Sequence, residues 1–171
     1  MSKKVFGFAG WSGSGKTTLV ERVISRLAGE GVRVSLVKHA HHSFDIDQPG
    51  KDSHRHRTAG ASEVLVSSRE RYALMHELRG ARELTLDEAL ARLSPCDLVL
   101  IEGFKRAPIP KLEIWRAAVG KPLLFPTDAH ILGLGTDDAL PDGVTADRLV
   151  RFALNDVAAV AAFVQSHAAA V

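Results

Sequence analysis

A glycine-rich stretch near the start of the chain has the composition of a phosphate-binding loop. Residues 10–17 read Gly-Trp-Ser-Gly-Ser-Gly-Lys-Thr, a full match to the pattern G-x-x-x-x-G-K-[ST]. An apolar run at 5–9 precedes it and an amphipathic segment follows, so backbone N–H groups and the positive end of a helix dipole would face one concavity. Lys16 is expected to reach the β- and γ-phosphates, and the Thr17 hydroxyl to ligate Mg²⁺. The predicted nucleotide-binding residues of this loop are Ser12, Gly13, Ser14, Gly15, Lys16, Thr17 and Thr18.

A second strand is expected to bring an acidic residue to the same place. Residues 98–101 read Leu-Val-Leu-Ile, which is typical of a central parallel strand buried on both faces, and Glu102 follows directly. Ligands of open α/β sheets collect at the carboxyl ends of such strands. A P-loop triphosphate needs Mg²⁺ and a carboxylate from a second strand, so we predict that Glu102 serves catalysis with Lys16, through the metal or through a positioned water. Asp97 begins the strand, about 15 Å away at roughly 3.3 Å per residue, and is not expected to touch the metal.

A polar loop is rich in potential metal ligands. Residues 39–47 hold three histidines and two aspartates. No cysteine joins them, and the histidine spacing matches neither a zinc finger nor the HExxH pattern. We interpret the segment as a solvated loop near the phosphates, in which Asp45 or Asp47 completes the Mg²⁺ shell and Lys38, His39 and Lys51 contact anions. Of the two aspartates, Asp45 is the predicted Mg²⁺ ligand. The alternative, a transition-metal site formed by the histidines, stays open.

The sequence leaves the choice of base undecided. The guanine-reading sequence Asn-Lys-x-Asp is absent, but residues 135–138 read Gly-Thr-Asp-Asp after a late apolar run. Asp137 could offer its carboxylate to the N1 and N2 donors of guanine, although a surface turn explains the segment equally well. Glutamine occurs only at positions 48 and 165, away from the P-loop and from Glu102, so we expect slow hydrolysis unless a partner contributes.

Composition limits the class of protein. The chain has 171 residues of which 46% are hydrophobic, enough for one core, so residues 1–171 are predicted to form a single nucleotide-binding domain with a β-extension at about 63–78. A formal net charge of +2 gives no indication of a nucleic-acid or membrane surface. The single cysteine, Cys96, excludes an internal disulfide, and no apolar run reaches the roughly 18 residues that span a bilayer. We expect a soluble, cytoplasmic protein.

The remaining pattern predicts an α/β, three-layer P-loop NTPase fold with a mostly parallel central sheet and a β-hairpin extension. Asn155 is expected to cap the last helix, and the final residues 168–171 are expected to fray. The predicted elements are a helix from about 17 to 29, a strand at 32–37, a short helix at 53–61, a hairpin of 63–67 with 71–76, a helix opened by a capping box at 85–88, and strands at 112–115 and 131–134.

Several stretches outside the P-loop are more specific to one protein family than the P-loop itself. They are 38–42 (Lys-His-Ala-His-His), 45–53 (Asp-Ile-Asp-Gln-Pro-Gly-Lys-Asp-Ser), 59–61, 71–75, 102–105 (Glu-Gly-Phe-Lys) and 155–157. Together with residues 11–18 they resemble the molybdopterin-guanine dinucleotide biosynthesis protein B family, from about residue 5 to residue 164.

The resemblance implies a function. Members of that family are GTP-binding adapters in molybdenum-cofactor maturation with weak GTPase activity, so it implies GTP and Mg²⁺ as ligands. It also implies contact with the molybdopterin guanylyltransferase and with cofactor-insertion proteins, and a homodimer formed through added strands, here the run 63–78. Glu102 is carried over as the second-strand acid and Lys105 as a substrate-side cation. The alternatives are a small-molecule P-loop kinase with Asp45 or Asp47 as base, and a metallochaperone GTPase using the histidine-rich loop.

Overall fold

The computed structural model describes residues 3–40 and 44–171. The chain divides into two compact units, one made of Met1–His39 with Leu86–Val171 and the other of Ala40–Thr85. Each unit has its own secondary structure and is described separately below.

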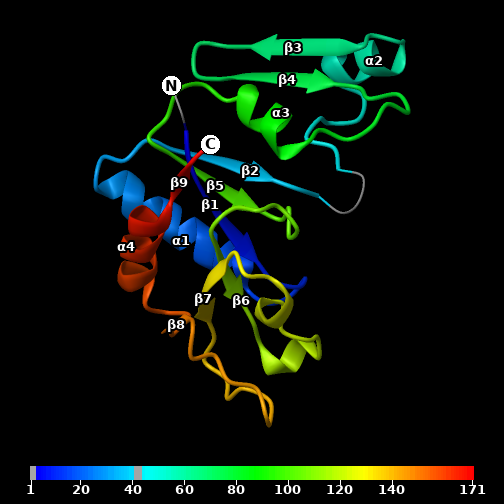
Figure 1. Ribbon diagram of the computed structural model, residues 1–171. Coiled ribbons are helices and arrows are strands. Elements are labelled where there is room, and N and C mark those ends of the chain that lie inside the picture. Colours follow the sequence, from blue (N-terminus) through cyan, green and yellow to red (C-terminus); the bar gives the residue numbers. More distant parts are fainter. Residues whose placement is uncertain (1–2, 41–43) are drawn as a thin grey trace. The chain divides into compact units, whose positions relative to one another are not determined.

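The larger unit is built on a seven-stranded sheet (Figure 1). The strand order is β2-β5-β1-β6-β7-β8, every neighbouring pair in this row is parallel, and β9 pairs antiparallel with the start of β1. The P-loop strand therefore lies between β5 and β6. The strands are β1 (Lys4–Ala9), β2 (Val34–Lys38), β5 (Leu98–Glu102), β6 (Lys111–Ile114), β7 (Ile131–Gly135), β8 (Val150–Phe152) and β9 (Ala169–Ala170).

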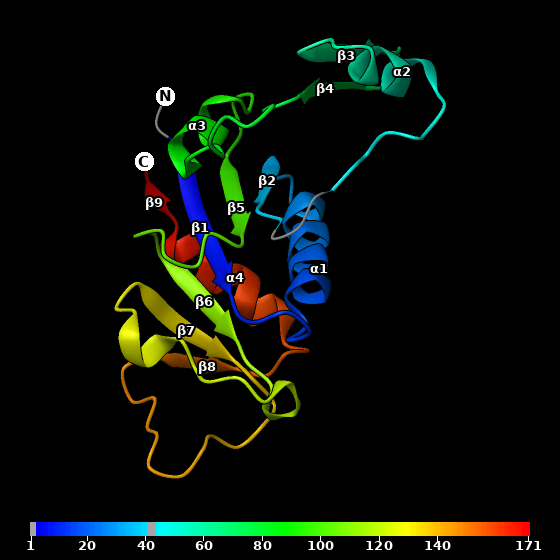
Figure 2. The same cartoon turned by 90° about the vertical axis from the view of Figure 1, so that its right-hand side faces the viewer.

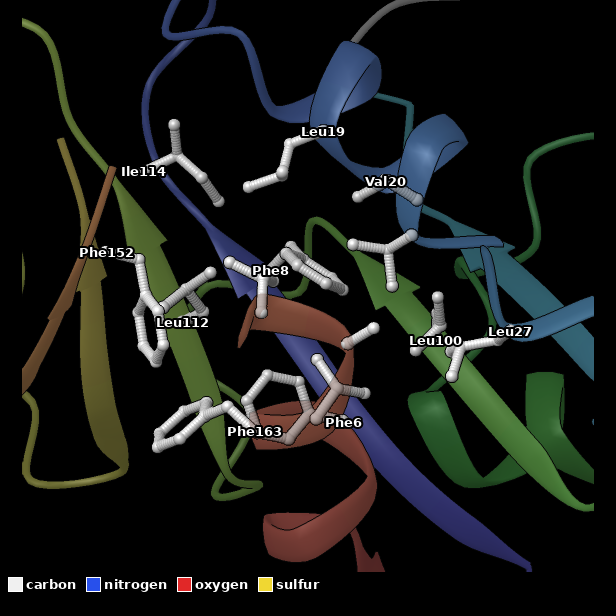
Figure 3. Packing of buried hydrophobic residues seen from close by; sticks show 14 of the residues in the cluster. Phe6, Phe8, Leu19, Val20, Leu27, Leu100, Leu112, Ile114, Phe152 and Phe163 are labelled. Atoms are coloured by element: carbon white, nitrogen blue, oxygen red, sulfur yellow. The ribbon is translucent and has the colours of Figure 1, made fainter. Parts of the chain in front are cut away.

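One face of this sheet is covered by α1 (Lys16–Gly29) and α4 (Val157–His167), which pack against each other (Figure 1). Successive residues of a strand point to opposite faces, so Phe6 and Phe8 of β1 and Leu100 of β5 enter this layer together. Figure 3 shows them meeting Leu19 from α1 and Phe163 from α4. Burying one side chain of this size stabilises the fold by roughly 1.5–3 kcal/mol, which makes this cluster the main support of β1 and the P-loop.

The opposite face has two smaller clusters. Val5, Val99 and Ile101 pack with Leu90 of α3 (Leu86–Ala91), and the 3₁₀ helix η2 (Phe125–Thr127) packs Phe125 against β7. A second 3₁₀ turn, η1 (Ala117–Val119), follows β6 (Figure 2). Helices on both faces of a parallel sheet give the expected three-layer architecture.

The smaller unit consists of α2 (Asp52–Thr58) and an antiparallel hairpin of β3 (Glu63–Ser67) and β4 (Tyr72–His76) (Figure 2). The hairpin agrees with the sequence prediction. Leu65 lies opposite Leu74, and the two are 61% and 52% exposed, whereas α2 contacts β3. Leu65 and Leu74 thus form an exposed apolar pair on one face of the hairpin.

Two expectations about the C-terminal part are wrong. The side chain of Asp156, not Asn155, caps α4 by accepting a hydrogen bond from Ala159 N at 3.1 Å. The last residues do not fray, because Ala169 and Ala170 pair with β1 as β9. The strand predicted at 112–115 is confirmed as β6, with its bounds shifted by one residue to Lys111–Ile114, whereas β8 was not predicted.

Candidate nucleotide-binding site

The loop between β1 and α1 has the conformation of a phosphate cradle. Gly10, Gly13 and Gly15 have φ values of 141°, 82° and 92°, which favour glycine. At Gly10 a Cβ would also lie 2.4 Å from the backbone oxygen of Ile114, so no side chain fits there. Gly15 is the N-cap of α1 and has no side chain with which to cap the helix, so the first N–H groups of α1 stay available to an anion.

Lys16 stands at the start of α1. Its Nζ donates a hydrogen bond to the carbonyl oxygen of Trp11 at 2.7 Å, within the same loop. Burial lowers the pKa of Lys16; the negative charge of Glu102 opposes this, and the positive charges of Lys105 and Lys38 add to it. A lysine that is partly desolvated beside two other cations is electrostatically suited to receive a polyphosphate.

Glu102 lies where the sequence predicted, at the carboxyl end of β5. Strand register sets it beside Phe8 of β1 and Lys38 of β2. Its Oε1 accepts a hydrogen bond from Thr17 Oγ1 at 2.8 Å and lies 3.5 Å from Lys38 Nζ. A hydroxyl and a buried carboxylate in contact are oxygen donors of the kind that Mg²⁺ prefers, so the pair fits this metal.

The backbone after Glu102 explains the Glu-Gly-Phe sequence. Gly103 has φ 97°, and a Cβ there would lie 2.8 Å from the Cβ of His39. Phe104 also has positive φ, at 46°, and its ring lies 4.9 Å from the imidazole of His39. His39 N donates to Glu102 O at 2.8 Å. The ends of β2 and β5 are thereby tied together around Glu102.

Two residues near the P-loop were missed by the sequence reasoning. Arg116 follows β6, and its Nε donates to the carbonyl oxygen of Ser14 at 3.2 Å. Lys111 at the start of β6 is 1% exposed and pairs with Asp128 at 2.6 Å. The positions of both residues depend on β6 lying next to β1. This pairing joins distant parts of the chain, so a local sequence pattern does not predict it.

Asp137, the candidate base-reading residue, follows β7. One of its carboxylate oxygens, Oδ1, accepts a hydrogen bond from Leu154 N at 2.8 Å. The neighbouring Asp138 accepts from Ala117 N through Oδ2, also at 2.8 Å. These contacts tie the end of β7 to the segments that follow β8 and β6.

Asp45, the third predicted metal ligand, lies in the smaller unit. Both of its carboxylate oxygens accept hydrogen bonds from Arg57 Nη2, at 2.9 and 2.7 Å, and Arg57 also contacts Asp47 and Glu77. The hydrogen bond from Arg57 lowers the pKa of Asp45. Ligation of Mg²⁺ by Asp45 would therefore compete with this ion pair.

The histidine-rich loop is described only in part. His41 and His42, on which the transition-metal alternative depends, lie outside the described residues. Among residues 3–40 and 44–171, no group of three or more His, Cys, Asp or Glu side chains is placed to hold a metal ion. Within the same ranges, no helix is both long and apolar enough to cross a membrane.

Comparison with known proteins finds relatives that share one name. The chain is 40% identical over 163 residues to the molybdopterin-guanine dinucleotide biosynthesis adapter protein of Escherichia coli (strain K12), covering 94% of this chain and 90% of that one. The protein of the same name from Haemophilus influenzae is 42% identical over 135 residues, or 78% of this chain and 74% of that one.

Solved structures share the fold of this chain. A crystal structure of molybdopterin-guanine biosynthesis protein B aligns with a TM-score of 0.70 at 27% identity, covering 95% of this chain and 98% of that one. Bacillus subtilis MobB shares the fold, with a TM-score of 0.74 at 24% identity and coverage of 97% and 98%. Residues 5–137 match the model of the family described as MobB, molybdopterin guanine dinucleotide synthesis protein B. The chain therefore belongs to the MobB family.

Proposed function

We propose that this protein is a GTP-binding adapter in molybdenum-cofactor biosynthesis that assists the conversion of molybdopterin to molybdopterin guanine dinucleotide. The observation that carries the proposal is the contact between Thr17 and Glu102, which joins a P-loop to a second-strand acid at 2.8 Å. The names of the relatives, which call them biosynthesis adapter proteins, support the pathway.

Thr17 and Glu102 are the residues that would hold Mg²⁺. Bound there, the ion would neutralise part of the charge on the β- and γ-phosphates. Lys16 would exchange its hydrogen bond to Trp11 O for the phosphates, and the N–H groups of residues 13–18 would surround them. Asp45 stays a candidate ligand that would have to leave Arg57 first.

Hydrolysis by the isolated protein should be slow. Neither of its two glutamines, at positions 48 and 165, lies next to the P-loop or to Glu102 in the sequence, so no water-positioning glutamine is evident. A nucleotide that persists in the site suits an adapter, because the loaded state then lasts long enough to be recognised by a partner. Asp137 is the candidate reader of guanine, with Oδ2 as the oxygen that does not accept from Leu154 N.

The partners proposed are the molybdopterin guanylyltransferase and the cofactor-insertion proteins. A second copy of the chain is also proposed, because the exposed Leu65 and Leu74 on the hairpin form an apolar pair that self-association would cover. The finding that supports a protein partner is again the adapter designation of the relatives.

The test is a calorimetric titration with GTP and with ATP, repeated in the presence of the guanylyltransferase. We expect GTP to bind at least tenfold more tightly than ATP, and the partner to change the affinity for GTP. Thermodynamic linkage requires GTP to change the affinity for the partner by the same factor, which provides an internal check. Preference for ATP without any effect of the partner would favour the kinase alternative and refute the adapter.

A further inference from the structure

Lys105 lies three residues beyond Glu102, in the segment that connects β5 to β6, and is half-buried. Its Nζ is 4.2 Å from the centroid of the Trp11 ring. Trp11 is the second residue of the P-loop, and its carbonyl oxygen accepts the hydrogen bond from Lys16. Two ammonium groups from different elements are therefore held on one residue of the loop.

The indole ring is a weaker partner for Lys105 than an anion would be. Within residues 3–40 and 44–171, no carboxylate lies within 4.0 Å of Lys105 Nζ, although Glu102 is three residues away. A cation over an aromatic face gains less than a cation in a charge-assisted hydrogen bond to phosphate. The Trp11 ring thus holds Lys105 in place, and the free energy lost on leaving the ring is smaller than that gained from a hydrogen bond to phosphate.

A buried ion pair positions the segment that carries Lys105. Lys111 Nζ donates to the carbonyl oxygens of Lys105 at 3.0 Å and Ala107 at 2.7 Å, and it pairs with Asp128. The stem of Lys111 crosses Gly7 of β1, where a Cβ would lie 2.7 Å from Lys111 Cγ. A charged side chain buried to this extent is costly unless it is fully bonded, and these bonds also hold the backbone at Lys105.

We propose that Lys105 is a second cation for the terminal phosphate of the bound triphosphate, held on Trp11 until the nucleotide arrives and placed by Lys111. Lys105 then distinguishes GTP from GDP, whereas Lys16 contributes to the binding of both. The inference rests on the proposed nucleotide function, and it adds the residue by which the site senses the γ-phosphate.

The test compares GTP and GDP binding by calorimetry in three proteins: wild type, Lys105→Met and the control Arg106→Met. Methionine keeps the aliphatic packing on Trp11 and removes the charge, and Arg106 is an exposed cation on the same segment. Lys105→Met should bind GTP about tenfold more weakly and GDP within twofold of wild type, while Arg106→Met should change neither. An equal loss for both nucleotides, or no loss for either, overturns the proposal. A wild-type protein that binds neither nucleotide refutes the proposed function instead.

Tryptophan fluorescence gives a second readout. The chain has two tryptophans, so Trp115→Phe leaves Trp11 as the only reporter. GTP should change its emission as Lys105 leaves the ring, GDP should not, and Lys105→Met should abolish the difference. If GDP with inorganic phosphate reproduces the change and GTP does not, Lys105 serves a separate phosphate group and the γ-phosphate assignment is wrong.

Discussion

Replacing Glu102 with glutamine removes one charge from the site with almost no change in shape. Glu102 is 6% exposed, and its Oε1 accepts a hydrogen bond from Thr17 Oγ1 at 2.8 Å and lies 3.5 Å from Lys38 Nζ. A glutamine oxygen can still accept from Thr17. Since the side chain of Lys38 is half exposed, losing the ion pair should cost less than about 1 kcal/mol of folding free energy.

The effect on metal binding should be larger. Bonds to a charged group contribute about 1.5–3 kcal/mol, and each 1.4 kcal/mol is a factor of ten, so the gain in GTP affinity on adding Mg²⁺ should fall by roughly 10- to 100-fold. Binding of GTP without the metal should be unchanged or slightly tighter, because a negative charge beside the phosphates has been removed. Turnover should fall to the background level.

Calorimetry with and without Mg²⁺ measures this directly. The matched control is Asp97→Asn, at the other end of the same strand, where the carboxylate binds Arg33 instead of the P-loop. The control should keep the full effect of Mg²⁺ on GTP binding. If Glu102→Gln also keeps it, or hydrolyses GTP at the wild-type rate, Glu102 is only structural.

Three further changes test other parts of the molecule. Lys16→Ala should weaken GTP binding by at least tenfold with an unchanged circular dichroism spectrum, and unaltered affinity would refute the P-loop assignment. Burial raises the pKa of Glu113, so its contribution to stability is present at low pH and is lost as the pH rises through that pKa. Glutamine does not titrate, so the free energy of unfolding of Glu113→Gln should increase relative to that of wild type as the pH rises from 5 to 8, measured by urea unfolding. A difference between the two proteins that does not change with pH would contradict this. Leu74→Lys should convert a dimer into a monomer by light scattering without changing GTP affinity, whereas a wild-type monomer at micromolar concentration would refute dimerisation.

Local sequence patterns predicted elements of both units. The buried apolar run at 98–101, the glycine pattern of the P-loop and the hairpin each follow from short-range chemistry, and each is found in the structure. The position of Glu102 could be predicted because the carboxyl ends of parallel strands lie at one edge of the sheet, where ligands bind.

Long-range contacts account for what the sequence reasoning missed. Lys111 and Glu113 interrupt the apolar pattern of β6, yet both are buried because Asp128 and the backbone N–H groups of Leu124 and Phe125 satisfy them. The short strands β8 and β9 exist only because β7 and β1 offer them an edge. Arg116 reaches Ser14 for the same reason: β6 follows β1 in the sheet but lies about a hundred residues later in the sequence.

The most direct test of the central claim is a crystal structure with a non-hydrolysable GTP analogue and Mn²⁺, whose anomalous signal locates the metal site. We predict a triphosphate surrounded by the N–H groups of residues 13–18, with the metal bound to Thr17 Oγ1 on the side of Glu102. A nucleotide bound elsewhere, or a metal that contacts neither Thr17 nor Glu102, would contradict the account.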